Sequence, residues 1–266
     1  MKKTLITLGL FFLAHNSYSQ IGGLSASKLG TLNTDAVPAR MMEFEPFFSY
    51  ASTNHTFDTN GIIHDLFETS DSILFFSSFG FRFSYGLFKD FEIGISVPVD
   101  VSIVSYGAKY KLPFKSKFTF ALMGGYNSIV GNSIYVKRNS SHESTSAVVS
   151  GLIVTYDLSD KFSCDFNVQY QKHINITAEG HTRGVFINSD IGYYFIENVN
   201  FILGLNYFFK EYDTFENNSH LFTLNPGVTI ERAKKFILVL NAPLDLIGKN
   251  EYKTTGFGLA LTIMLN

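Results

Sequence analysis

Alternation of apolar and polar residues, in segments of about ten residues, constrains this chain more than any other feature. Residues 72–87 show it most clearly. One face carries the bulky apolar residues Ile73, Phe75, Phe79, Phe81, Phe83, Tyr85 and Leu87, and the other carries Ser78, Gly80, Arg82, Ser84 and Gly86. A period of two predicts a strand with two unlike faces. A membrane barrel turns bulky residues toward lipid and small polar residues toward its lumen, so the pattern favours such a barrel over a soluble β-sandwich.

The first nineteen residues are typical of a secretory signal peptide. Lys2 and Lys3 form its positive start. The apolar run from Leu5 to Ala14 is shorter than the about 18 residues that an uncleaved membrane anchor would need. Small residues in Ser17-Tyr18-Ser19 suit a cleavage site, so we expect the mature chain to start at Gln20. Export supports the membrane barrel.

Twelve strands are expected, at 43–52, 72–87, 91–99, 103–112, 117–129, 145–157, 162–171, 184–195, 199–210, 220–231, 236–244 and 254–265. Their connections alternate in length. Short turns are expected at 88–90, 113–116, 158–161, 196–198 and 232–235, and long loops at 53–71, 131–144, 172–183, 211–219 and 245–253. The connection near 100–102 lies at the same end as the long loops but is itself short. Bacterial barrels have short periplasmic turns and longer extracellular loops. The sequence therefore predicts an all-β, transmembrane, antiparallel up-and-down β-barrel.

Composition excludes several functions. The net charge of −2 offers no electrostatic basis for binding nucleic acid. The single cysteine, Cys164, excludes an internal disulfide and a cysteine-based metal cluster. No cofactor-binding motif is present, so we expect no cofactor.

Some barrels of this size are enzymes, and a hydrolase would need a nucleophile beside a base. The histidines of the mature chain all fall in or beside expected long loops: His55, His64, His142, His173, His181 and His220. Of these, His220 follows Ser219 directly, and neighbouring residues on a strand point to opposite faces. We therefore expect no catalytic residue. A metal-collecting rim of these histidines is the alternative, because imidazole is a common metal ligand. Long loops are polar and histidine is polar, so we expect no metal site.

The inward face is expected to carry mixed charges. The candidates that face the lumen are Glu43, Glu45, Arg82, Glu92, Lys109, Lys111, Asp165, Asp190, Lys210 and Glu231. Unpaired charges are costly in a partly filled lumen, so these groups should pair. Counting outward from the connection near residue 101 places Lys111 opposite Glu92.

The N-terminal segment 20–42 breaks the alternation and is too polar and glycine-rich to span a membrane. It either trails in the periplasm or folds into the lumen as a plug. Leu24, Leu29 and Leu32 would gain burial in the lumen, where Arg40 could meet Glu43, Glu45 or Asp190. Both placements remain open at this stage.

Three short stretches resemble a known family. They are Gly23-Leu24-Ser25-Ala26-Ser27-Lys28-Leu29, Glu43-Phe44-Glu45-Pro46 and Phe91-Glu92-Ile93-Gly94-Ile95-Ser96-Val97-Pro98. With the barrel pattern, they make the chain similar to outer-membrane barrels of Bacteroidota grouped with transporters of the "MetA pathway of phenol degradation" type. The resemblance implies a barrel of about twelve strands that passes small molecules, with apolar ones among the candidates, and it implies no catalytic residue.

Three parts are thus expected: a signal peptide at 1–19, an N-terminal periplasmic or plug segment at 20–42, and an outer-membrane β-barrel at 43–266. The expected protein is a monomeric, porin-like channel in the outer membrane of a Gram-negative bacterium. Its partners are the lipid bilayer and a small solute that passes without energy input. One alternative is a non-conducting scaffold or accessory barrel of a secretion or gliding machinery, with a protein partner in the outer membrane or periplasm. An outer-membrane hydrolase is the third hypothesis.

Overall fold

The computed structural model describes residues 23–25, 29–68, 72–99, 103–114, 116–130, 146–174, 181–212, 218–232 and 235–266. The strands are β1 (Met42–Phe57), β2 (Ile63–Asp65), β3 (Leu74–Phe88), β4 (Phe91–Pro98), β5 (Ile103–Lys111), β6 (Phe118–Ile129), β7 (Ala147–Ser159), β8 (Phe162–His173), β9 (His181–Ile196), β10 (Val199–Tyr212), β11 (Ser219–Arg232), β12 (Phe236–Asn241), β13 (Leu244–Lys249) and β14 (Glu251–Leu265). Within this described part, no helix is long and apolar enough to cross a membrane.

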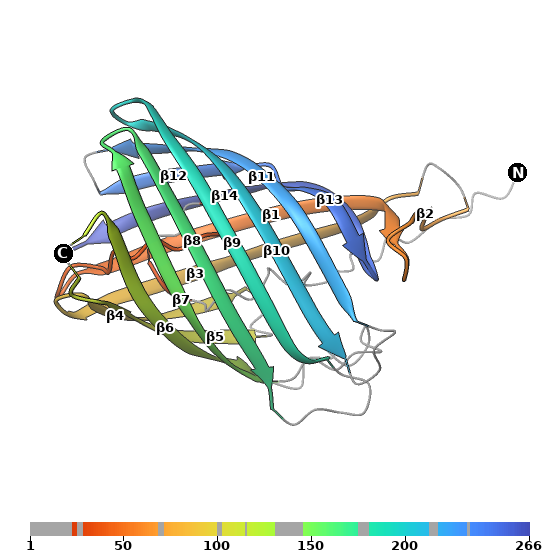
Figure 1. Cartoon of the computed structure of the whole chain (residues 1–266), viewed down its shortest axis with the longest axis horizontal. Helices are drawn as coiled ribbons and strands as arrows, with labels where there is room; N and C mark the ends of the chain where they lie inside the picture. The colour runs from red at the N-terminus through yellow and green to blue at the C-terminus, as the bar shows by residue number, and fades with distance from the viewer. Residues whose placement is uncertain are drawn as a thin grey trace, which may run out of the picture.

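The strands form one closed, antiparallel barrel (Figure 1). Neighbouring strands pair in sequence order, and β14 returns to pair with β1 from Met42↔Leu265 to Phe57↔Glu251. The short strand β2 extends a hairpin at the far end of β1. Strands β12 and β13 share one position in the wall, between β11 and β14. The wall of described strands therefore has twelve members, and the expected fold class is confirmed.

Two expected long loops are wrong in part or whole. Strand β1 runs on to Phe57 and is followed by the β2 hairpin, so only part of 53–71 is a loop. The expected loop 245–253 is mostly strand, because β13 reaches Lys249 and β14 begins at Glu251. Asn250, between them, has a φ of 51°. Polar residues there resembled a loop in the sequence, but strand pairing uses backbone groups and continues through polar side chains.

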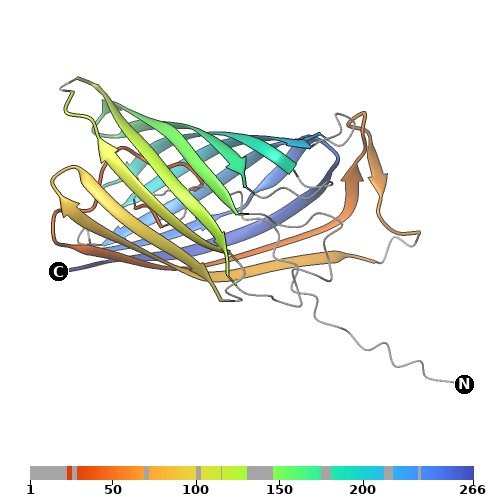
Figure 2. The same cartoon turned by 90° about the horizontal axis from the view of Figure 1, so that it is seen from below.

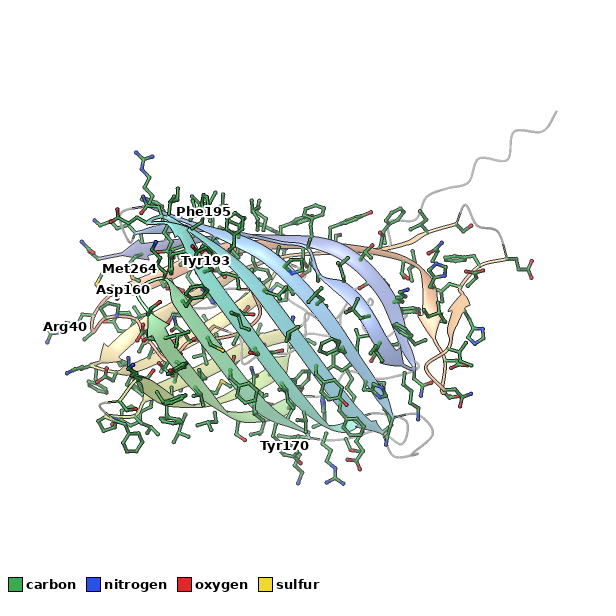
Figure 3. The ribbon with its side chains drawn as sticks, turned by 45° about the horizontal axis from the view of Figure 1, so that its top comes forward. Arg40, Asp160, Tyr170, Tyr193, Phe195 and Met264 are labelled. Atoms are coloured by element: carbon green, nitrogen blue, oxygen red, sulfur yellow. The ribbon has the colours of Figure 1, made fainter. Side chains whose placement is uncertain are left out.

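The two faces of the wall differ as the alternation predicts. Along β3, Phe75, Phe79 and Tyr85 are exposed outward, whereas Arg82 and Ser84 are buried inward. Outward rings also pack between strands, as in the Phe118–Tyr156 pair, whose centroids are 4.4 Å apart. In Figure 3, Tyr193 and Phe195 lie toward the end of the barrel with the short turns, and Tyr170 lies toward the opposite end. An apolar exterior around polar buried residues is the reverse of a soluble sandwich.

The faces can be tested by placing one charge on each side of β3. Phe81→Arg should lower the free energy of unfolding by about 2–4 kcal/mol, because the charge would face the hydrocarbon near its midplane. Ser78→Arg should cost less, because its side chain enters the lumen. Ser78 is a better control than Gly80, where a Cβ would lie 2.6 Å from the Phe47 ring. Urea unfolding in liposomes measures the free energy of unfolding of both variants. A larger decrease for Ser78→Arg would show that the inward and outward faces are the reverse of those assigned.

Candidate functional site

Most of the described residues before β1 lie inside the barrel, and residues 38–40 are exposed at its end. We call residues 23–25 and 29–41 the inner segment. Its most buried residues, each at most 2% exposed, are Leu24, Ser25, Thr31, Leu32, Thr34 and Val37. Figure 2 shows this part of the chain, in red and orange-red, within the ring of strands near the end where the C-terminus lies. The lumen and the inner segment together form the candidate functional site.

Two leucines dock the inner segment on the wall. Leu24 and Leu32 form a buried cluster with side chains of β6 and β7, namely Ala121, Met123, Val149 and Ile153. Each fully buried leucine contributes about 1.5–3 kcal/mol from the hydrophobic effect. Sequence reasoning expected these leucines to favour burial but missed the patch that receives them. The signal was present, because these four residues occupy positions where the alternation calls for small polar side chains.

Side chains of the wall satisfy the backbone of the inner segment. The Asn167 amide accepts a hydrogen bond from Leu32 N and donates one to Leu32 O, both at 2.7 Å. Thr34 N donates to Thr155 Oγ1 at 3.0 Å. On another part of the wall, Asn225 Nδ2 donates to Leu29 O at 3.0 Å. Buried backbone groups need such partners, and here the lumen-facing polar residues replace a neighbouring strand.

Glu92 joins two distant points of the inner segment. Its carboxylate accepts hydrogen bonds from Ser25 N at 2.8 Å, Ser25 Oγ at 2.5 Å and Val37 N at 2.7 Å. Lys109 Nζ lies 3.4 Å from Glu92 Oε1 and donates to Ser25 O at 3.1 Å and Asn33 O at 3.3 Å. Both side chains are fully buried. We call the Glu92–Lys109 pair the latch.

The expected pairing of Lys111 with Glu92 is wrong. The register of β4 and β5 places Lys109 opposite Glu92, because their connection is centred one residue earlier than the count assumed. A slip of two residues keeps every side chain on its expected face. Lys111 instead pairs with Asp35 of the inner segment, with Nζ 2.6 Å from Oδ1.

Arg82 joins the inner segment to the start of β1. Its Nη2 donates to Glu43 Oε1 at 2.6 Å and Glu45 Oε2 at 2.7 Å, and its Nη1 donates to Leu24 O at 2.6 Å. The role suggested for Arg40 is therefore wrong. Arg40 is exposed at the end of the barrel (Figure 3), with a φ of 67°.

The remaining candidates for the lumen lie farther around the wall. Asp165 and Asp190 are buried and directly opposite each other on β8 and β9. Asp190 Oδ2 accepts a hydrogen bond from Leu29 N at 3.3 Å. Lys210 pairs with Glu251 at 3.1 Å, and Glu231 accepts a hydrogen bond from the Tyr194 hydroxyl at 2.7 Å.

The histidines are spread over several strands. His55 lies 2.9 Å from Asp65, and His64 lies 3.0 Å from Asp58, at the β1–β2 hairpin. His142 lies outside the described residues. Among the residues that are described, no three His, Cys, Asp or Glu side chains gather closely enough to hold a metal ion.

Comparison with known proteins shows the fold. No protein-family model and no curated protein matches the chain. An outer membrane channel from Pseudomonas putida F1 superposes with a TM-score of 0.65 at 12% identity, covering 87% of this chain and 98% of that one. The NanC porin superposes with a TM-score of 0.53 at 7% identity, covering 84% of this chain and 99% of that one. The KdgM porin superposes with a TM-score of 0.50 at 11% identity, covering 82% of this chain and 98% of that one. The barrel thus has the fold of outer-membrane channels, while the family resemblance inferred from sequence stays a prediction.

The latch can be tested with Glu92→Gln. A glutamine has one acceptor oxygen, and its amide NH₂ would face a donor of the inner segment. A buried donor left without a partner costs about 1–3 kcal/mol. We therefore expect faster hydrogen exchange at Ser25 and Val37, read by mass spectrometry of peptides from the inner segment. Asp35→Asn is the control, because it breaks an exposed ion pair worth about 0–1 kcal/mol. Unchanged exchange in Glu92→Gln would contradict the latch.

Proposed function

We propose that this chain is a monomeric channel of the outer membrane of a Gram-negative bacterium, through which a small solute passes without energy input. The observation that carries the proposal is how the lumen is filled. An eight-stranded barrel fills its interior with its own side chains, and a sixteen-stranded one leaves an aqueous channel. Here twelve strands enclose a separate stretch of chain, which side-chain hydrogen bonds and one leucine patch hold in place.

Such a filling can move without dismantling the wall. The inner segment forms an isolated β-bridge to the wall at Ala39↔Gly86, and many of its other polar contacts with the wall are hydrogen bonds to side chains. Each of its polar contacts exchanges for water at a net cost of about 0.5–1.5 kcal/mol. A protein used only as a scaffold has no need of a removable filling. The structural neighbours, named as channels and porins, support the same function over an enzyme.

The inner segment is proposed to enter from the periplasm, after removal of a signal peptide at 1–19. Ala39 bridges Gly86 near the β3–β4 turn, one of the short turns. Asn33 and Asp35 line a recess of about 440 Å³ together with Asp157 and Asp160 near the β7–β8 turn. Short turns face the periplasm in bacterial barrels. Residues 20–42 would then narrow the pore from its periplasmic end, and 43–266 would form the barrel.

The solute is proposed to be small, with apolar molecules among the candidates, as the sequence resemblance implies. The alternative is a non-conducting scaffold or accessory barrel of a secretion or gliding machinery. The filled lumen favours this alternative if the inner segment never leaves. Conductance with and without the inner segment separates the two.

Deletion of residues 20–41 should raise single-channel conductance in planar bilayers and leave the barrel folded. The wall keeps all its strand pairs in this variant, because β1 begins at Met42. Heat-modifiable migration on a gel checks the fold. A folded deletion protein with unchanged conductance, when the full-length protein conducts, would show that the segment does not narrow the pore. If neither protein conducts or admits a neutral solute, the scaffold is the better description.

Orientation can be tested by cysteine labelling of intact cells in a Cys164→Ser background. Asn60→Cys places a thiol in the exposed β1–β2 turn, and Lys161→Cys places one in the β7–β8 turn at the other end. An impermeant maleimide should label position 60 and not 161, because long loops face outward. Both should react after lysis, which controls for accessibility. Labelling of position 161 alone on intact cells would show that the barrel has the opposite orientation in the membrane.

A further inference from the structure

One row of the inward face is apolar. Phe186, Phe208, Leu221 and Gly248 are direct cross-strand partners on β9, β10, β11 and β13. The three side chains are buried, at most 4% exposed, and the Phe186 and Phe208 ring centroids lie 6.3 Å apart. The row lies toward the end of the barrel opposite the short turns and the inner segment. Alternation had predicted small polar residues here, and the signal missed was doublets of apolar residues such as Phe208-Phe209.

Polar residues flank this row on both sides. On the side of the short turns the next row is Asn188, Asn206 and Thr223, and on the other side it is Gly184, Lys210 and Ser219. The apolar stripe is therefore one row deep in an otherwise hydrogen-bonding wall.

The row continues where its glycine leaves space. A Cβ on Gly248 would lie 2.5 Å from the Phe57 ring and 2.8 Å from Leu221 Cδ1. Phe57 comes from β1, and β13 and β14 separate it from β11 in the wall. Its ring thus crosses the inner surface to reach Leu221, with which it forms a buried cluster. We call Phe57, Phe186, Phe208 and Leu221 the apolar collar.

Two further rings extend the same band. Phe76 of β3 is buried, and its ring centroid lies 5.7 Å from that of Tyr252 on β14. The two strands are separated by β1, which carries Phe57. Aromatic or apolar side chains therefore face inward on β9, β10, β11, β14, β1 and β3.

We propose that the apolar collar is the channel's barrier to hydrated ions, an inference that rests on the proposed function. An ion crossing a pore needs wall groups that replace its water, and the four side chains of the collar have none. The collar covers one side of the wall: Gln169 of β8 lies opposite Phe186, and Lys210 Nζ lies 4.5 Å from the centroid of the Phe208 ring. Hydrophobic constrictions accordingly close pores by dewetting. A small neutral solute sheds less hydration and passes such a constriction more readily. The collar, not the polar lumen beyond it, then sets the selectivity of the channel.

Polarity and size can be separated at the two phenylalanines of the collar. In the full-length protein, Phe186→Asn with Phe208→Asn supplies hydrogen-bonding groups, whereas Phe186→Ala with Phe208→Ala removes more volume and stays apolar. A dewetted barrier predicts several-fold higher single-channel conductance in potassium chloride for the asparagine pair than for the alanine pair. A steric constriction predicts the opposite order. Both pairs are also measured with Glu92→Gln, which loosens the inner segment.

Asn188→Ala with Asn206→Ala is the matched control, because it removes side chains from the neighbouring row of the same two strands. It should change conductance less than the asparagine pair at the collar. The proposal is overturned if the alanine pair conducts as well as or better than the asparagine pair. It is also overturned if the folded asparagine pair with Glu92→Gln conducts no ions. Liposome swelling with a neutral sugar tests the proposed function separately, since swelling does not depend on ion conduction.

Discussion

Lipid offers no partners for backbone hydrogen bonds, so every strand of the wall must be paired on both sides, and the rest of the structure depends on that requirement. Pairing of β1 with β14 meets it by closing the sheet. Closure with twelve strands creates an interior larger than an eight-stranded barrel can fill with its own side chains. The lumen must therefore be wet or filled by something else. The inner segment lies in one end, and the apolar collar lies on one side of the wall toward the other.

The inner segment and the charges of the lumen depend on each other. Burial of an ion costs several kcal/mol unless partners surround it. Glu92 and Lys109 have each other, but Ser25, Val37 and Asn33 supply their remaining partners. Water would take over these contacts if the segment left and the lumen filled. The exchange of polar contacts is then nearly balanced, and burial of Leu24 and Leu32 biases the segment toward the docked position.

Period-two alternation sufficed to predict the closed barrel and the outward face, because lipid contact selects bulky apolar residues at every second position. It did not predict where polar strands end, since Asp245 and Lys249 lie in a strand despite a loop-like composition. Register is harder still. A slip of two residues between β4 and β5 leaves the faces unchanged, so the pattern could not distinguish Lys109 from Lys111 as the partner of Glu92. The leucine patch and the collar were missed because both depart from the alternation that revealed the barrel.

Polar contacts hold the inner segment at one end of the lumen, whereas apolar contacts join the side chains of the collar toward the other end. The latch is polar, so water competes with its hydrogen bonds and can accompany the inner segment as it moves. Water cannot replace anything at the apolar collar, where Phe186, Phe208 and Leu221 offer no donor or acceptor. In the proposed channel, movement of the inner segment would admit water to the polar part of the lumen and leave the collar as a separate barrier. A solute reaching the collar would then be sorted by its hydration, independently of the contacts that hold the inner segment.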